Sequence, residues 1–310
     1  MRVVITGGAG FIGSHLVEKF LANGHQVLVL DDLSTGSYAN ISPFFKNTNF
    51  EFVQFDVRDS FSFELDLIVN LACPASPIHY QKDPIKTLTT SILGTLNCLQ
   101  LAQQKGARLV HASTSEVYGD PEISPQVETY LGSVNPIGPR ACYDEGKRCA
   151  ETAIYDYKRI HNLDARVIRI FNTYGPRMQR DDGRVVSNFI VSALEENPIT
   201  IYGNGTQTRS FCYVQDTVDA IYMISTLEIA PVTPVNVGNP IEISMLTLAE
   251  LILRLTNSGS SLEYLALPAD DPKQRCPDIE LAKELLAWEP KIDLTQGLND
   301  TIKYFKSTNV

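Results

Sequence analysis

Short apolar runs alternate with amphipathic segments along the first half of the chain. Six of these runs predict strands, at residues 3–5, 27–30, 50–55, 67–70, 108–112 and 165–171. Between the first two, residues 11–21 carry apolar side chains at helical spacing. Strands that alternate with helices in this way form a doubly wound parallel sheet. We therefore expect an α/β fold with a Rossmann domain over residues 1–171.

The second half of the chain predicts a smaller lobe. Helical patterns at 185–196, 246–257 and 279–286 surround short apolar runs at 200–202 and 263–266. Most of residues 172–310 should form this carboxy-terminal, substrate-binding lobe, which we expect to cover the cofactor cleft. The sequence contains no repeat or low-complexity segment, so a solenoid or scaffold is not supported.

A glycine-rich turn joins the first predicted strand to the first predicted helix. Gly7, Gly10 and Gly13 recur at three-residue intervals. Glycines let the backbone approach a pyrophosphate, and the following helix offers free N–H groups and the positive end of its dipole. Asp31 ends the second strand, eighteen positions after Gly13. Its carboxylate suits the ribose diol of NAD and repels the 2′-phosphate of NADP, so the sequence predicts NAD as the cofactor.

Tyr143 and Lys147 are four residues apart, a spacing that stacks two side chains on one face of a helix. A nearby positive charge favours the phenolate and lowers the pKa of a tyrosine toward the working pH. We therefore expect Tyr143 to take a proton from a sugar hydroxyl and to return one.

Composition excludes several other classes of function. The 310 residues carry a formal net charge of -10, which argues against a nucleic-acid partner. The six cysteines form no Cys-x-x-Cys pair and the five histidines show no metal-ligand spacing. We expect no metal and a reducing, cytoplasmic location. The sequence has neither a signal peptide nor an apolar run near twenty residues, so no membrane partner is expected.

The glycine spacing together with Tyr-x-x-x-Lys is similar to the extended branch of the short-chain dehydrogenase/reductase superfamily. Longer motifs resemble the UDP-glucuronate decarboxylase (UDP-xylose synthase) family, and its Pro-Ala-Ser-Pro run and Thr-Ser-Glu triplet separate it from near relatives. The motifs are NLACPASPIHYQKDPIKT at 70–87, STSEVYGDP at 113–121, GPRACYDEGKR at 138–148, FNTYGPRM at 171–178, DDGRVVSNF at 181–189, YGNGTQTRSFCYVQD at 202–216 and DDPKQRCPDI at 270–279. This resemblance implies that 209–238, with the segment 211–226 and a strand at 234–237, returns to the Rossmann domain.

The resemblance also implies a redox cycle on UDP-glucuronate. Tyr143, Thr114 and Lys147 would oxidise C4, the resulting 4-ketone would lose carbon dioxide, and the hydride would return to give UDP-xylose. Glu116 corresponds to an additional catalytic carboxylate. The catalytic residues are therefore expected to be Thr114, Glu116, Tyr143 and Lys147.

Binding residues follow from the same resemblance. Asp56 is expected to read the adenine amino group, Tyr80 to lie along the sugar, and Asn172 and Asn188 to hold the phosphate or base end of the nucleotide. The expected cofactor-binding residues are Gly7, Gly10, Phe11, Ile12, Gly13, Asp31, Asp56, Val57, Tyr143 and Lys147. The expected substrate-binding residues are Tyr80, Asn172, Arg184, Asn188, Tyr202, Arg209 and Arg275, the arginines as forked donors to diphosphate and carboxylate.

Four alternatives stay open. A dTDP-glucose 4,6-dehydratase carries Asp where this chain has Ser115, and a UDP-glucose 4-epimerase typically lacks the acid at Glu116. A bifunctional apiose/xylose synthase remains an option, as does a non-enzymatic NAD-binding regulatory protein, although the latter should have lost Tyr143 or Lys147. The resemblance further implies a homodimer through helices around 84–104 and 143–160.

Overall fold

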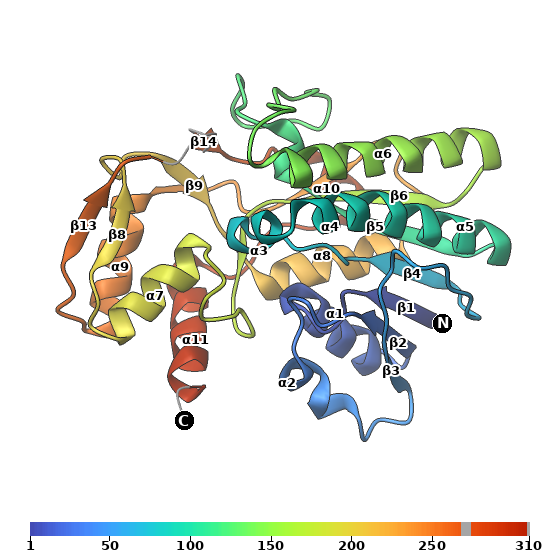
Figure 1. The fold of residues 1–310 in the computed structure, drawn as a ribbon, viewed down its shortest axis with the longest axis horizontal. Coiled ribbons are helices and arrows are strands. Elements are labelled where there is room, and N and C mark those ends of the chain that lie inside the picture. Colours follow the sequence, from blue (N-terminus) through green and yellow to red (C-terminus); the bar gives the residue numbers. More distant parts are fainter. Residues whose placement is uncertain (268–273, 309–310) are drawn as a thin grey trace.

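The computed structural model describes residues 1–267 and 274–308, so residues 270–273 of the motif at 270–279 lie outside the described part. Its largest sheet has seven strands in the order β11-β6-β5-β4-β1-β2-β3, and every neighbouring pair is parallel (Figure 1). The strands are β1 (Arg2–Thr6), β2 (Gln26–Asp31), β3 (Phe50–Gln54), β4 (Leu67–Asn70), β5 (Arg108–Thr114), β6 (Ala165–Ile170) and β11 (Val235–Val237). The order reverses between β1 and β4, which is where a doubly wound sheet opens a ligand crevice.

Helices cover both faces of this sheet. On one face α1 packs against α8, and on the other α4 and α5 pack against α6. The alternation along β1 explains the two layers, because Val3 and Ile5 lie in one hydrophobic cluster and Val4 in the other. The helices of this part are α1 (Phe11–Ala22), α2 (Tyr38–Ile41), α3 (Pro77–Lys82), α4 (Pro84–Thr89), α5 (Thr95–Lys105), α6 (Ala141–His161) and α8 (Val214–Thr226), with short 3-10 turns at Ser42–Phe44 and Ser115–Tyr118 and a π-helical turn at Thr90–Gly94.

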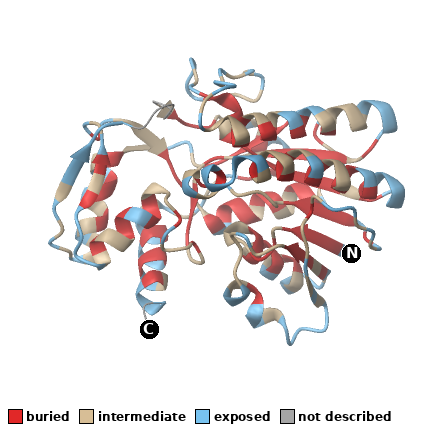
Figure 2. Cartoon of the chain, viewed as in Figure 1, coloured by how far each residue is buried: buried red, intermediate tan, exposed pale blue. Residues whose placement is uncertain are grey.

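A smaller lobe with its own core lies beside the sheet (Figures 1 and 2). Its core includes Ile190, Leu248, Leu298 and Phe305, each completely buried. Its helices are α7 (Val185–Leu194), α9 (Met245–Thr256) and α11 (Leu294–Ser307). Its strands form a parallel pair, β8 (Ile199–Tyr202) with β13 (Leu262–Leu265), and a three-stranded sheet of β12 (Glu242–Ser244), β9 (Thr208–Ser210) and β14 (Gln274–Arg275). A two-stranded parallel sheet, β7 (Thr173–Tyr174) with β10 (Cys212–Tyr213), completes the described strands.

One sequence prediction about this division is wrong. The helix expected at 279–286 is present as α10 (Glu280–Leu286), but it packs against α8 and β11 of the large sheet and not in the smaller lobe. Its apolar face is buried in the same cluster as Trp288, whose Nε1 donates a hydrogen bond of 2.9 Å to the backbone oxygen of Asp216. Burial against the sheet therefore decides the position of α10.

Candidate active site

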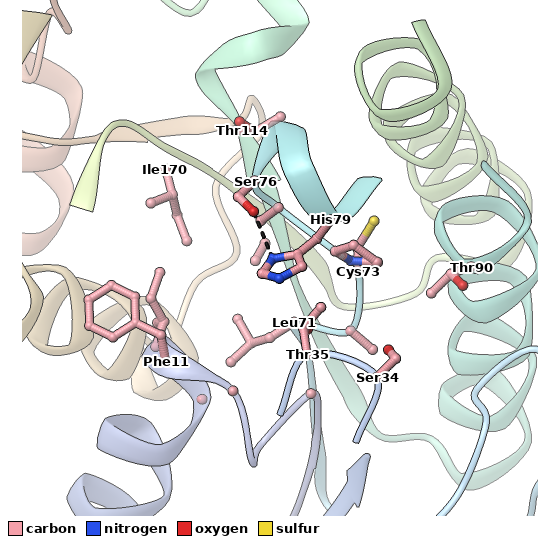
Figure 3. Close-up of a pocket in the computed structure, with 18 of the residues that line it drawn as sticks. Phe11, Ser34, Thr35, Leu71, Cys73, Ser76, His79, Thr90, Thr114 and Ile170 are labelled. Atoms are coloured by element: carbon pink, nitrogen blue, oxygen red, sulfur yellow. Dashed lines mark hydrogen bonds between the residues drawn. The ribbon is translucent and has the colours of Figure 1, made fainter. Parts of the chain in front are cut away.

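A cleft opens at the carboxyl ends of β1, β2, β4 and β5, where the strand order reverses (Figure 3). All of the residues that the sequence assigns to cofactor binding and catalysis line it. They are Gly7, Gly10, Phe11, Ile12, Gly13, Asp31, Asp56, Val57, Thr114, Glu116, Tyr143 and Lys147, and the predicted substrate residues Asn172 and Arg184 line it too. A single concave site thus gathers segments from the whole first half of the chain and from the start of the second.

The glycine turn forms one wall of the cleft. Gly7 has a φ of +70°, and a Cβ at this position would lie 2.9 Å from the backbone nitrogen of Ala72. Only glycine meets both conditions without strain. Helix α1 then begins after Gly10, and no side chain caps its first N–H groups. These free donors face the cleft and form an anion site of the kind that holds a pyrophosphate.

Asp31 lies at the end of β2 and is 6% exposed. Its Oδ2 accepts a hydrogen bond of 2.9 Å from the backbone nitrogen of Ala9, and its Oδ1 accepts one of 2.8 Å from that of Leu33. Burial raises the pKa of this carboxyl, and the two backbone donors counteract the shift. Each oxygen keeps a further lone pair, so the carboxylate is held in place and can still accept from a diol.

Asp56 is bound by its own neighbour Arg58. The Arg58 Nη2 lies 2.6 Å from Asp56 Oδ2, and the hydrogen bond to Arg58 is the main cause of the lowered pKa of Asp56. The carboxylate therefore stays ionised at the edge of the cleft. It lines the cleft together with Val57.

Tyr143 and Lys147 lie one turn apart on α6 and face the end of β5. The hydroxyl of Thr114 lies close enough to the Tyr143 phenol to favour its ionised form, and the Lys147 Nζ donates a hydrogen bond of 2.7 Å to the backbone oxygen of Ala112. Lys147 Nζ lies 5.9 Å from the centroid of the Tyr143 ring. The three side chains that acid–base work at a sugar hydroxyl requires are therefore adjacent.

The expected lowering of the Tyr143 pKa by Lys147 is not found in this structure. Burial raises the pKa of Tyr143 above its ordinary value, while the neighbouring Thr114 hydroxyl acts in the opposite direction. Burial also lowers the pKa of Lys147. Removal from water is the largest cause of both pKa shifts.

Glu116 lies next to Thr114 in the turn after β5, where two arginines from distant segments reach it. Arg140 Nη2 lies 2.6 Å from Glu116 Oε2, and Arg275 Nη2, from β14 of the smaller lobe, lies 3.2 Å from the same oxygen. Burial alone would raise the pKa of Glu116, but Arg275 and Arg140 outweigh it and lower the pKa to about 2. Glu116 is therefore ionised in the structure.

Asp144, which the sequence analysis does not single out, lies near this ion cluster. It is 6% exposed, and its Oδ1 has no hydrogen-bond partner among the described residues. Burial, followed by the charge of Glu116, raises its pKa to about 7. Its position directly after Tyr143 is the only sequence signal that could have identified it.

Several predicted substrate residues lie outside the cleft wall. Tyr202 ends β8 and is 44% exposed, and Asn188 lies on α7. Arg209 on β9 donates to the backbone oxygen of Thr208 at 2.8 Å. Arg275 is 1% exposed, and its link to the cleft is the ion pair with Glu116. Arg209 and Arg275 are paired neighbours on β9 and β14, and the charges of both lower the pKa of Glu116. Tyr202 and Asn188 have no such link to the cleft among the described residues, and the binding roles of all four stay predictions.

Other residues that line the cleft were not anticipated. Ser76 Oγ lies 2.8 Å from His79 Nδ1 in the segment after β4 (Figure 3). Thr90, in the π-helical turn, is 7% exposed, and its hydroxyl finds no partner within the described part of the chain. This group also includes Asp32, Ser34, Thr35, Cys73, Lys86, Arg177 and Gln179. The position of Cys73 and Ser76 after a central strand is a signal that could have identified them.

Comparisons with known proteins agree with this geometry. A family model described as GDP-mannose 4,6 dehydratase matches residues 4–301. UDP-glucuronic acid decarboxylase 2 of Arabidopsis thaliana is 53% identical, and the alignment covers 99% of this chain and 68% of that protein. UDP-glucuronic acid decarboxylase 1 of Xenopus tropicalis is 52% identical over 98% of this chain and 72% of its own length.

Solved structures share the fold at lower identity. A UDP-glucuronic acid 4-epimerase from Bacillus cereus, in complex with UDP-glucuronic acid and NAD, has a TM-score of 0.89 and 26% identity, with 99% of this chain and 100% of that chain covered. A UDP-glucose 4-epimerase from Thermotoga maritima, with UDP-glucose, has a TM-score of 0.89 and 30% identity, with 99% of each chain covered. No described helix is long and apolar enough to cross a bilayer. The chain, about half identical over nearly its whole length to plant and vertebrate relatives, belongs to the UDP-glucuronic acid decarboxylase family, within the wider group that the dehydratase model describes.

Proposed function

We propose that this protein decarboxylates UDP-glucuronate to UDP-xylose and that NAD is reduced and reoxidised within each turnover. The observation that carries the proposal is the position of an ionised Glu116, whose backbone nitrogen donates to the Thr114 hydroxyl, in the same cleft wall as Tyr143. The relatives named decarboxylases are 52–53% identical, whereas the two epimerases of known structure described above are 26–30% identical. A decarboxylase is therefore favoured over an epimerase.

The residues of the cleft fit NAD. A Cβ at Gly7 or Gly13 would clash with the backbone, and the first turn of α1 offers uncapped N–H groups. Asp31 presents a carboxylate that a hydrogen bond from the Ala9 backbone nitrogen holds beside this turn. Thr90 adds an unpaired buried hydroxyl. When bound, NAD would supply the hydride acceptor and donor of the reaction. The proposed cofactor residues remain those assigned from the sequence.

The first chemical step is oxidation at C4 of the sugar. Tyr143, as phenolate, takes the proton of the C4 hydroxyl while C4 loses hydride, and Thr114 shares the hydrogen bond to that oxygen. Lys147 provides positive charge near the phenolate, 5.9 Å from the ring centroid. The product of this step is a 4-ketone, which lies β to the C6 carboxylate.

The ketone makes loss of carbon dioxide possible. The C5–C6 bond breaks and its electron pair enters an enolate whose charge rests on the C4 oxygen, next to the Tyr143 and Thr114 hydroxyls. Protonation at C5 restores the ketone. Hydride then returns to C4 and Tyr143 gives back its proton, so no net oxidation occurs. The C5 proton comes from water, because the ionised Glu116 carries none to donate. We assign Glu116 to positioning of the sugar and to proton transfer from that water to C5.

We also propose that the remaining predicted residues bind the nucleotide sugar, namely Tyr80, Asn172, Arg184, Asn188, Tyr202, Arg209 and Arg275. Asn172 and Arg184 are the best placed of these, because both line the cleft. A homodimer through α4, α5 and α6 is proposed as well, and Ile85 and Ile160 are exposed on these helices. The cytoplasmic location stays a prediction.

The test is incubation of purified protein with UDP-glucuronate. We expect carbon dioxide and UDP-xylose in equal amounts and no accumulation of NADH. Stoichiometric NADH with a free 4-keto pentose would contradict the closed cycle. UDP-galactose formed from UDP-glucose at a comparable rate would establish an epimerase, and UDP-apiose beside UDP-xylose would establish the bifunctional synthase.

A further inference from the structure

The loop at residues 32–36, directly after β2, is tied to two distant segments. On one side, Lys86 Nζ of α4 lies 2.6 Å from Asp32 Oδ2. On the other, Gln179 Nε2, in the segment after β7, donates a hydrogen bond of 2.8 Å to the backbone oxygen of Thr35. All four residues line the cleft. The loop therefore carries a bridge on each of its two sides.

The base of the same loop is fixed to the cofactor site. Asp31 holds the backbone nitrogens of Ala9 and Leu33, and the Asn40 side chain donates to the backbone oxygen of Ala9 at 3.0 Å. Since Asp31 is the residue proposed to bind the adenosine ribose, the 32–36 loop lies along that half of the dinucleotide site. A ligand there lies next to a loop whose base is fixed and whose outer part is held by Lys86 and Gln179.

Both interactions are weak enough to break and form again. The Lys86 and Asp32 side chains are 28% and 27% exposed, so the pair contacts solvent and can separate without leaving a buried charge. Burial opposes the ionisation of Asp32, but hydrogen bonds from Lys86 and Ser34 outweigh it and lower the pKa of Asp32. The Gln179 bond is a single neutral hydrogen bond, which typically contributes about 0.5–1.5 kcal/mol.

We propose that Lys86 and Gln179 are cofactor-retaining residues, whose two bridges hold the 32–36 loop across the adenosine half of the site so that NAD stays bound between the two hydride transfers. This inference rests on the proposed function. A redox-neutral cycle returns the hydride to the same sugar only if the reduced cofactor does not leave first. Retention of the reduced cofactor is therefore necessary for the reaction. Lys86 and Gln179 act by positioning the loop and contact neither C4 nor C5 of the sugar.

The test measures the dissociation rate of NAD. Protein loaded with radiolabelled NAD is diluted into excess unlabelled NAD, and the label that remains bound is followed over time. Lys86→Met and Gln179→Glu should each accelerate dissociation about two- to fivefold, and the double variant about tenfold. Lys86→Arg, which can keep the ion pair, should restore most of the retention. During turnover, the double variant should also release a measurable fraction of NADH with 4-keto pentose.

Matched controls separate retention from general loosening of the fold. Lys19→Met removes a similar ion pair, since Lys19 Nζ lies 2.8 Å from Asp219 Oδ1 with side chains 30% and 36% exposed. Gln207→Glu removes a similar amide-to-carbonyl bond, 2.7 Å long, to Tyr202. Neither Lys19 nor Gln207 lines the cleft. Both control variants should release NAD at the wild-type rate.

Two outcomes would overturn the proposal. One is a double variant that releases NAD no faster than wild type, and the other is equal acceleration by the controls. If wild-type protein decarboxylates UDP-glucuronate in either case, the loop assignment alone has failed. A wild-type protein that binds no NAD would overturn both the retention and the cofactor assignment.

Discussion

The rings of Tyr80 and Tyr143 are parallel to within 2°, and their centroids lie 5.2 Å apart. Tyr80 is 1% exposed, and its hydroxyl has no hydrogen-bond partner in the described chain. The ring of Tyr80, on helix α3, thus stacks on the ring of Tyr143, the residue that we propose as acid–base catalyst. The contact fixes the plane of the Tyr143 ring, and with it the direction in which the phenol oxygen points.

This stacking predicts different results for two substitutions of Tyr80. Tyr80→Leu should lower kcat about two- to tenfold, because an aromatic pair contributes about 0.5–1.5 kcal/mol beyond its buried area. Tyr80→Phe keeps the ring and should retain kcat, while any rise in KM would report a bond from the Tyr80 hydroxyl to substrate. Steady-state kinetics on both variants provide the measurement. Equal kcat for Leu and Phe would mean that the stacking does not position Tyr143.

Tyr143→Phe removes the group that moves the C4 proton and leaves the ring stack in place. Loss of a general acid–base typically costs about a hundred- to ten-thousandfold in rate. We expect this decrease in kcat, with NAD and UDP-glucuronate bound as in wild type by calorimetry. A variant that binds both and turns over at nearly the wild-type rate would transfer the acid–base role to another residue.

The pKa of Tyr143 predicts the pH dependence of the rate. Because burial raises this pKa and the phenolate is the active form, the fraction of active enzyme should increase as pH rises. Lys147→Met removes the positive charge near the phenolate, so the rise in kcat should move to higher pH. The pH profiles of kcat for wild type and variant provide the comparison, and Lys147→Arg serves as the control that keeps a positive charge. Identical profiles for wild type and Lys147→Met would rule out an electrostatic role for this lysine.

Glu116→Gln keeps the shape of the side chain but removes the charge that two arginines surround. Turnover should fall by about a hundredfold or more if Glu116 moves the C5 proton, while NAD binding stays close to wild type. Full activity of this variant with unchanged product would end the catalytic assignment and leave decarboxylation to the ketone alone.

The same substitution has a consequence for stability. The pKa of Glu116 is lowered from its ordinary 4.5 to about 2, so the ionised carboxylate contributes stability above about pH 4.5 and loses it as pH falls toward 2. Glu116→Gln should therefore unfold with a weaker dependence on pH across that window. Urea unfolding of both proteins at several acidic pH values measures this difference.

Asp31 should set both the affinity for NAD and the discrimination against NADP. Asp31→Ala removes an ionised acceptor for the ribose hydroxyls and should weaken NAD binding about ten- to a hundredfold. Asp31→Asn keeps one oxygen acceptor for Ala9 or Leu33 and should lose less affinity while accepting NADP more readily. Binding titrations of wild type and both variants with NAD and with NADP measure these affinities. Equal wild-type affinity for NAD and NADP would contradict the assignment.

Local spacing explains which parts of the site the sequence could predict. Gly7, Gly13 and Asp31 belong to one strand–turn–helix–strand unit, in which chain connectivity alone brings the residues together. The contact between Glu116 and Arg275 joins residues 159 positions apart, and it depends on how the smaller lobe packs. Resemblance to a family could indicate that Glu116 and Arg275 are functional, but their spacing in the sequence could not show that they are in contact.

The spacing of residues in the sequence also does not predict how deeply a side chain is buried. The four-residue interval correctly places Tyr143 and Lys147 on one helix face, yet the pKa of Tyr143 rises because the surrounding protein removes water from the phenol. Lys86 and Gln179 were missed for a related reason. Their partners, Asp32 and Thr35, lie on a loop whose position is known only once the sheet is assembled.

The position of α10 bears on how the chain can fold during synthesis. The edge strand β11 and the covering helices α8 and α10 come from residues 214–286, and Trp288 closes the same core. A nascent chain of which only residues 1–171 have left the ribosome therefore has an incomplete sheet, with apolar surface exposed on β6 and α1. The larger lobe cannot reach its final state until nearly the whole polypeptide has emerged, so its completion should be among the last events of biosynthesis and not the first.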